Sequence, residues 1–152
     1  MAVRTKLRQV PLLLVGSLLV ACASTALPSP TPGDFTAVLE ALALRGATIH
    51  EAISGDAGCE VPLHGNAVRL ALTLEQDGRD HRVYLFRWRR PADFERAAGA
   101  FEECVAEHAG SDAAVELETI ELPPWRAYGP DWSSEMRQAL EEALRAAGAT
   151  SQ

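Results

Sequence analysis

The sequence predicts a single small α+β domain over residues 34–152, built from one mainly antiparallel sheet of about four strands and about three helices. Three patterns predict this class. Apolar residues recur at steps of three and four near both ends of the region and once in its middle, which is the period of a half-buried helix. Between them, apolar and polar residues alternate on both sides of a turn sequence, which is typical of an antiparallel hairpin. The expected order is α-β-β-β-α-β-α.

The first helix is expected to begin at Asp34, a residue type that caps helix N-termini, and to end before Gly46. Its apolar stripe consists of Phe35, Val38, Leu39 and Leu42. Residues 47–53 are expected to form a strand. The turn-forming residues 54–58 then lead to Cys59.

The clearest hairpin spans residues 69–88. Its first strand has leucine at every second position, at Leu70, Leu72 and Leu74. A turn at 76–80 follows. The second strand carries apolar residues at both parities, with Val83 and Leu85 on one side and Tyr84, Phe86 and Trp88 on the other. This pattern predicts an interior strand that is covered on both faces.

A second helix follows the hairpin, and Cys104 lies on its apolar face. The next strand is expected within residues 113–122, where the apolar residues change parity between Leu117 and Ile120. An extra residue would correct this change of phase, so we expect a β-bulge near Glu118-Thr119.

Residues 125–130 are expected to form an aromatic loop, and Asp131 is expected to cap the last helix. Tryptophan and tyrosine bury much area and still offer a hydrogen bond, so this loop and the end of the hairpin are candidates for a binding surface. The candidate residues are Trp125, Tyr128, Trp132, Trp88 and Arg89. The alternative is that the rings fold back onto the sheet and brace the last helix, and that the arginines are a solvated strand end.

Residues 1–21 resemble an export signal. Basic residues precede an apolar run at 10–20, which is too short to span a bilayer. The run ends in Leu19-Val20-Ala21-Cys22, which resembles the bacterial lipobox. The resemblance implies that Cys22 becomes the N-terminus and carries acyl chains such as palmitate, which hold the protein at the extracytoplasmic side of the cell membrane. The alternative is an ordinary signal cut near Ala21 or Ala23.

Residues 22–33 contain three prolines and no charge, which predicts an extended tether between the lipid and the domain. Three of the 14 basic residues lie in the export signal and none of the 21 acidic residues does, so 11 basic residues remain and the rest of the chain carries about −10. Such an acidic body disfavours nucleic acid as a partner, because phosphate binding needs clustered lysine and arginine.

The chain has three cysteines, an odd number for an exported protein. If Cys22 carries lipid, Cys59 and Cys104 remain, and a disulfide between them is the default in an oxidising compartment. The order Ser-Gly-Asp-Ala-Gly-Cys at 54–59, Val-Tyr-Leu-Phe-Arg at 83–87 and a helix with Cys104 also resembles small, uncharacterised bacterial lipoproteins. That resemblance supports the disulfide and implies no activity.

The residue types that carry catalysis are dispersed along the chain. The four histidines, His50, His64, His81 and His108, stand at no spacing typical of metal ligands, so no metal and no cofactor is expected. His50 and His81 would approach one another if their strands paired. Ser54 lacks the glycine spacing of a nucleophile elbow, and turn geometry is its expected role.

We interpret the domain as a non-catalytic binding or accessory module of the cell envelope, for a protein or small-molecule partner. One alternative is an envelope hydrolase whose site is assembled from His, Asp and Glu residues far apart in the sequence. Another is a structural envelope component without a discrete ligand. A pocket that joins at least one histidine to carboxylates, with a shifted pKa, would favour the hydrolase.

Overall fold

The computed structural model describes residues 33–60, 62–111 and 115–149. Within these ranges the helices are α1 (Gly33–Ala43), α2 (Pro91–Arg96), α3 (Ala98–Ser111) and α4 (Ser134–Ala149), with a 3-10 turn, η1 (His64–Asn66). The strands are β1 (Ala47–Ser54), β2 (Ala67–Leu74), β3 (Arg79–Arg87), β4 (Leu117–Leu122) and β5 (Trp125–Pro130). The export signal, Cys22 and the tether up to residue 32 lie outside the described residues. Every helix described is too short or too polar to cross a bilayer.

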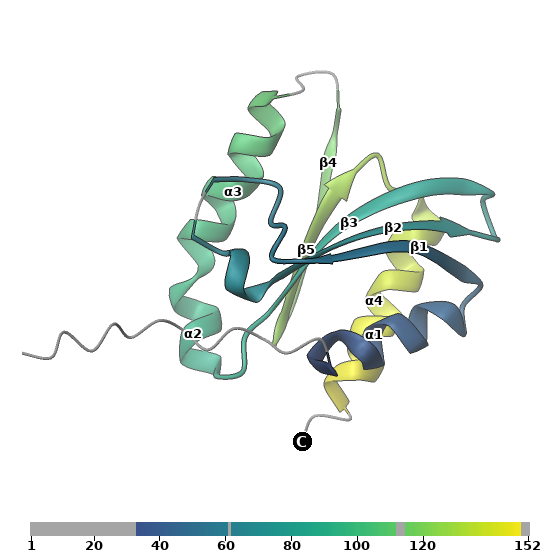
Figure 1. Ribbon diagram of the computed structural model, residues 1–152, viewed down its shortest axis with the longest axis horizontal. Helices are drawn as coiled ribbons and strands as arrows, with labels where there is room; N and C mark the ends of the chain where they lie inside the picture. Colours follow the sequence, from purple (N-terminus) through teal and green to yellow (C-terminus); the bar gives the residue numbers. More distant parts are fainter. Residues whose placement is uncertain (1–32, 61, 112–114, 150–152) are drawn as a thin grey trace, which may run out of the picture.

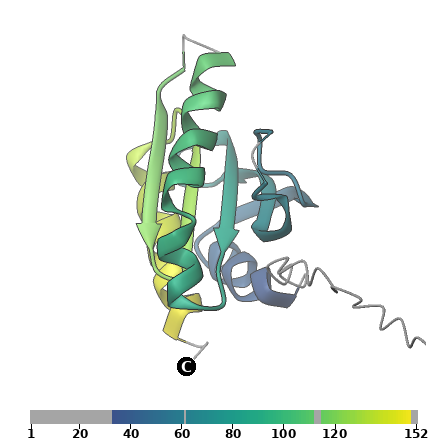
Figure 2. The ribbon, with the colours of Figure 1, turned by 90° about the vertical axis from the view of Figure 1, so that its left-hand side faces the viewer.

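The strands form one sheet in the order β1-β2-β3-β5-β4, and all neighbours are antiparallel. Helices α1 and α4 cover one face of this sheet, and α2 and α3 cover the other (Figures 1 and 2). The predicted α+β class is confirmed, as is the β2–β3 hairpin. The middle helix differs from the expectation, because the chain breaks at Ala97 into the short α2 and the longer α3.

Two hydrophobic clusters, one on each face, make up the core. Val83 and Leu85 of β3 pack with α1 and α4, whereas Tyr84 and Phe86 pack with α2 and α3. Side chains of a strand alternate between its two faces, so apolar residues at both parities require cover on both sides. The prediction of an interior strand is therefore confirmed.

The expectation of an aromatic loop at 125–130 is wrong, because these residues form β5 between β3 and β4. Its last residues are Gly129 and Pro130, and both residue types are depleted in strands. The sequence pattern therefore did not indicate a strand here. Continuing the β3–β5 register places Pro130 opposite Arg82, and proline has no N–H to donate. The indole of Trp132 supplies the missing donor, with Nε1 2.9 Å from the Arg82 carbonyl oxygen.

Gly129 makes room for this indole. A Cβ at that position would lie 2.2 Å from the Arg82 carbonyl oxygen and 2.6 Å from Trp132 Nε1. Glycine is therefore required by a close approach of backbone and ring.

The β-bulge expected near Glu118-Thr119 is also absent, since the β4–β5 register runs without a shift from Leu117 to Leu122. The change of parity has another cause. Leu117 packs in the α2/α3 cluster, whereas Ile120 packs in the α1/α4 cluster, so each parity meets its own core. A register shift occurs instead in β1, between Ile49 and Glu51.

Ser133, rather than Asp131, caps α4. Its Oγ accepts a hydrogen bond from the Met136 N–H at 3.0 Å, and its carbonyl accepts the Arg137 N–H at 2.9 Å. Asp131 lies before the helix with a φ of 46°. One apolar stripe along this region is buried throughout: Trp132, Met136, Ala139, Leu140, Ala143, Leu144 and Ala147.

The same serine ties α4 to the β2–β3 turn, because its hydroxyl also donates to the carboxylate of Asp77. Asp77 Oδ2 also lies 2.8 Å from His81 Nε2, and Asp77 Oδ1 accepts a hydrogen bond from the Arg79 N–H at 2.9 Å. Burial by itself raises the pKa of Asp77, but the hydrogen bonds from Ser133, Arg79 and His81 outweigh it and lower the pKa from 3.8 to about 2.

We expect Asp77 to contribute to stability in a pH-dependent way. Because its folded pKa lies below its unfolded value, the contribution is complete above about pH 4 and is lost as the pH falls through about 2. Asp77→Asn should lower the free energy of unfolding at neutral pH by about 1–2 kcal/mol and flatten its dependence between about pH 4 and 2. Urea titrations at a series of pH values measure both effects.

Glu75→Gln, a substitution at an exposed carboxylate in the same turn, is the control and should leave the pH dependence unchanged. An Asp77→Asn variant that follows the acid profile of the wild type would contradict the assignment.

Candidate functional site

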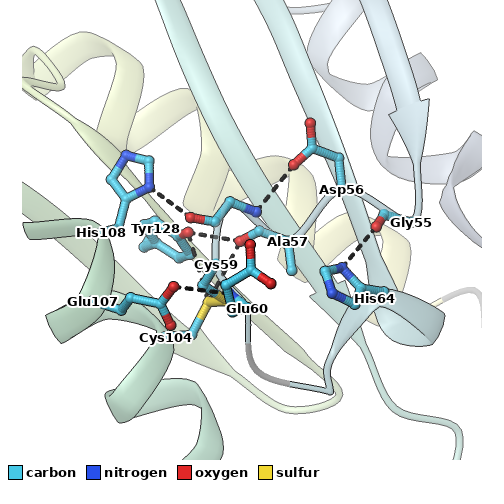
Figure 3. Close-up of a disulfide and its surroundings, with 11 residues drawn as sticks. Gly55, Asp56, Ala57, Cys59, Glu60, His64, Cys104, Glu107, His108 and Tyr128 are labelled. Carbon is cyan, nitrogen blue, oxygen red and sulfur yellow. Dashed lines mark hydrogen bonds between the residues drawn. A yellow bond between two sulfur atoms is a disulfide. The ribbon is translucent and has the colours of Figure 1, made fainter. Parts of the chain in front are cut away.

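An open cleft of about 480 Å³ lies where the segment after β1 crosses α3. Its titratable side chains come from the segment after β1, from η1 and from α3. They are Asp56, Glu60, His64, Glu107 and His108. Figure 3 shows Glu107 and His108 of α3 on one side of the crossing segment and His64 on the other. We call this feature the acidic cleft, because three of the five groups are carboxylates.

The Cys59–Cys104 disulfide fastens the crossing segment to α3, with the two Cα atoms 5.3 Å apart. This pairing confirms the sequence prediction. Two hydrogen bonds reinforce it. The Glu60 N–H donates to Glu107 Oε1 at 3.0 Å, and His108 Nδ1 lies 2.9 Å from the Gly58 carbonyl oxygen. The wall of the cleft is therefore fixed to the helix by one covalent and two polar links.

Tyr128 of β5 supports the segment from beneath. Its hydroxyl donates to the carbonyl oxygen of Ala57 at 2.7 Å, and both residues are fully buried. Burial, followed by the nearby Tyr84, raises the pKa of Tyr128 well above its usual range, so the phenol remains a neutral donor. Gly58 has a φ of +72°, and a Cβ there would lie 2.5 Å from the Tyr128 hydroxyl, so only glycine fits over the ring.

Asp56 is used within the protein. One carboxylate oxygen accepts the Gly58 N–H at 3.0 Å, and the other accepts Arg69 Nε at 2.6 Å. The hydrogen bond to Asp56, together with the nearby Glu51, raises the pKa of Arg69. Arg69 pairs with both Asp56 and Glu51, so Asp56 is engaged within the protein, and Glu60 and Glu107 are the other two carboxylates of the cleft.

The two histidines of the cleft are oriented by the backbone. His64 Nδ1 lies 3.0 Å from the Gly55 carbonyl oxygen, and His108 Nδ1 bonds to Gly58 in the same way. A carbonyl oxygen only accepts, so Nδ1 carries the hydrogen in both rings, and in a neutral ring the lone pair is on Nε2. These two hydrogen bonds fix the orientation and the tautomer of both rings at the cleft.

The aromatic surface suggested by the sequence is not a surface in the structure. Trp88, Trp125, Tyr128 and Trp132 are each 8% exposed or less. Trp125 and Trp132 belong to the α1/α4 cluster, and Trp88 and Tyr128 to the α2/α3 cluster. The alternative, in which the rings fold back onto the sheet, describes them correctly. Arg89 is exposed just after β3, whereas Arg87, the last residue of that strand, lies over the buried Trp125 ring at 5.2 Å from its centroid.

The remaining histidines lie elsewhere. His50 bonds to Thr73 Oγ1 at 2.6 Å and His81 to Asp77. Strand β2 lies between their strands, so the pairing that would have brought the two histidines together does not occur. Ser54 lines the acidic cleft. Among the described residues, no group of three or more His, Cys, Asp or Glu side chains converges as metal ligands would.

Sequence reasoning missed the cleft, although a signal for it was present. Asp56 and Glu60 lie within three residues of Cys59, and Glu107 and His108 lie about one helical turn after Cys104. A disulfide between these cysteines necessarily brings their neighbours together. Reading outward from the predicted bridge would have found four of the five titratable groups.

Comparisons with protein-family models, with curated proteins and with solved structures each found no match. The chemistry of the cleft is therefore the basis for a functional proposal.

We expect loss of the disulfide to destabilise the domain substantially. Closing a loop with a sequence separation of 45 contributes about 4 kcal/mol in the chain-entropy model. The double variant Cys59→Ala, Cys104→Ala should lower the free energy of unfolding by about this amount, as measured by urea titration. Dithiothreitol should destabilise the wild type and have no effect on the variant. Equal stability of oxidised and reduced wild type would contradict the expectation.

Proposed function

We propose that the chain is an exported, lipid-anchored protein of the cell envelope whose domain is a non-catalytic binding module, with the acidic cleft as its ligand-contacting part. The occupant would be a cationic group rich in N–H donors, because the cleft is lined by three carboxylates. Such a group can belong to a small molecule or to a side chain of a protein partner.

Two features support the envelope location. The lipobox-like Leu19-Val20-Ala21-Cys22 follows a short apolar run. The pair that the structure joins, Cys59 and Cys104, is the pair left over once Cys22 is assigned to lipid. Disulfides of this kind persist in oxidising compartments, so the bridge agrees with export.

The observation that carries the binding proposal is the way the cleft is preorganised. The bridge, the Glu60–Glu107 bond and the His108–Gly58 bond all fix its wall before any ligand arrives. A rigid site loses little conformational entropy on binding, which favours affinity. Five titratable side chains line the cleft, and three of them are carboxylates, which suits a cationic group.

One observation favours the hydrolase alternative, since His64 and His108 share a cleft with three carboxylates. The hydrogen bonds favour binding. The imidazoles are oriented by carbonyl oxygens, and the carboxylates of Asp56 and Glu107 hold main-chain N–H groups of the crossing segment. The acidic groups thus shape the loop rather than positioning a histidine toward Ser54.

The lipid anchor is tested by Cys22→Ser. We expect this variant to lose labelling with radioactive palmitate and to leave the membrane fraction, while its circular dichroism spectrum and the Cys59–Cys104 bridge stay unchanged. Ala23→Ser, next to the predicted acylation site, is the matched control and should label normally. Palmitate incorporation into Cys22→Ser would contradict the proposed anchor.

The cleft is tested with arginine amide, a small dication, added to ¹⁵N-labelled full-length protein. We expect concentration-dependent shifts of the Gly58 and Glu60 amide signals. Because two carboxylates are lost, Glu60→Gln with Glu107→Gln should weaken binding about fivefold or more.

The control pair Glu40→Gln with Glu95→Gln removes the same charge from exposed positions on α1 and α2. It should bind like the wild type. Equal weakening by both pairs would show that the protein attracts cations only through its net charge, and the cleft would be rejected as the site.

A further inference from the structure

A second surface, separate from the acidic cleft, lies on the other side of α3. A groove of about 250 Å³ runs between this helix and β4, with Phe101, Val105, Ala106 and Ala109 on the helix side. Thr119 and Glu121 of β4 line the opposite side, and Glu102 of α3 completes the lining. Figure 2 looks onto this face, with α3 in front of the sheet and β4 along its outer side.

Among the strands described, β4 is the last of the sheet on this side. The direction of its backbone groups follows from the ladder. The Asp131 N–H donates to the Glu116 carbonyl at 3.0 Å, so Glu116 and Asp131 form a hydrogen-bonded pair in the register of β4 and β5. Pairs alternate in an antiparallel ladder, so the N–H and C=O groups of Leu117, Thr119 and Glu121 point away from β5.

The hydrogen bonds between β3 and β5 lead independently to the same orientation of the β4 backbone groups. The Trp88 N–H donates to the Pro124 carbonyl at 3.1 Å, so the even-numbered residues of β5 bond to β3 and the odd-numbered ones to β4. Gly129, Ala127 and Trp125 then bond to the even-numbered residues of β4. This leaves the odd-numbered residues of β4 with outward backbone groups and with side chains toward the groove.

We propose that the outer edge of β4 and the groove beside it dock an extended, basic segment of a partner protein, which adds a strand to the sheet. Residues of that strand opposite Thr119 would share its face and place their side chains in the groove. Small aliphatic side chains fit its apolar floor. The alternate side chains would lie along the other face of β4 and are expected to be lysine or arginine.

Charge complementarity supports this occupant. Four glutamates surround the edge strand: Glu102, Glu116, Glu118 and Glu121. Arg137 pairs with Glu118 at 2.5 Å and Arg126 with Glu121 at 2.8 Å, so the surface keeps a net negative charge. A second copy of the chain would set β4 glutamates against one another, and the predicted tether, residues 22–33, carries no charge. A basic strand would hydrogen-bond to the outward backbone groups of β4 and would carry charge opposite to that of the surface.

The opposite edge of the sheet is less suited to this role. Strand β1 carries the register shift between Ile49 and Glu51, and irregularities of this kind interrupt a regular edge. The β4 ladder has no shift over its six residues.

The test uses full-length protein and a fluorescent seven-residue peptide in which valine alternates with lysine or arginine. We expect saturable binding by anisotropy, with amide shifts at Leu117, Thr119 and Glu121. A peptide of the same sequence with every valine N-methylated keeps its charge and its side chains but lacks the donors that face β4. It should bind about tenfold more weakly or worse.

Thr119→Pro removes the outward N–H of β4 without removing a bond to β5, and proline is tolerated on edge strands. We expect it to weaken peptide binding about tenfold, whereas Thr119→Val keeps the N–H and should bind like the wild type. Equal binding of the N-methylated peptide would overturn the proposal even if Thr119→Pro failed to fold. Peptide-induced shifts confined to Gly58 and Glu60, or shifts at β4 on raising the protein concentration alone, would also overturn it.

Discussion

The second half of strand β3 and its neighbour β5 are buried on both faces, and the arrangement of the helices depends on that requirement. Apolar side chains at both parities must be kept from water on both sides, so α1 with α4 and α2 with α3 form two layers around one sheet. The aromatic rings fill these layers. Even the cation Arg126 on β5 is 2% exposed, paired with Glu121 and bonded to the Phe94 carbonyl, because a buried charge needs such partners.

A sheet covered on both faces leaves its loops and edges for contact with other molecules. The acidic cleft is one such place, and it depends on the core beneath it, since Tyr128 holds Ala57 and closely approaches Gly58. The disulfide holds the same segment from the side of α3. Helix α3 therefore separates two candidate surfaces, one polar and fixed by a covalent bond, the other an apolar groove beside an edge strand.

Much of the fold follows from local pattern. The hairpin, the stripe of α4 and the two faces of β3 are set by the spacing of apolar residues, which is a local property. Strand β5 could not be found this way, because Gly129 and Pro130 break its pattern and Trp132 replaces the missing proline N–H. The change of parity in β4, from which a bulge was predicted, likewise results from tertiary packing, because Leu117 and Ile120 pack in different clusters.

The sequence alone determined the α+β class and the cysteine pair, because residue periodicity and cysteine count are visible without coordinates. It also carries the lipobox-like pattern around Cys22 that underlies the proposed location. Only the tertiary structure decided which polar residues meet. Asp56 and Glu60 join Glu107 and His108 across the bridge, and β4 becomes an edge beside α3. These are long-range relations, set by how elements pack rather than by what each segment prefers.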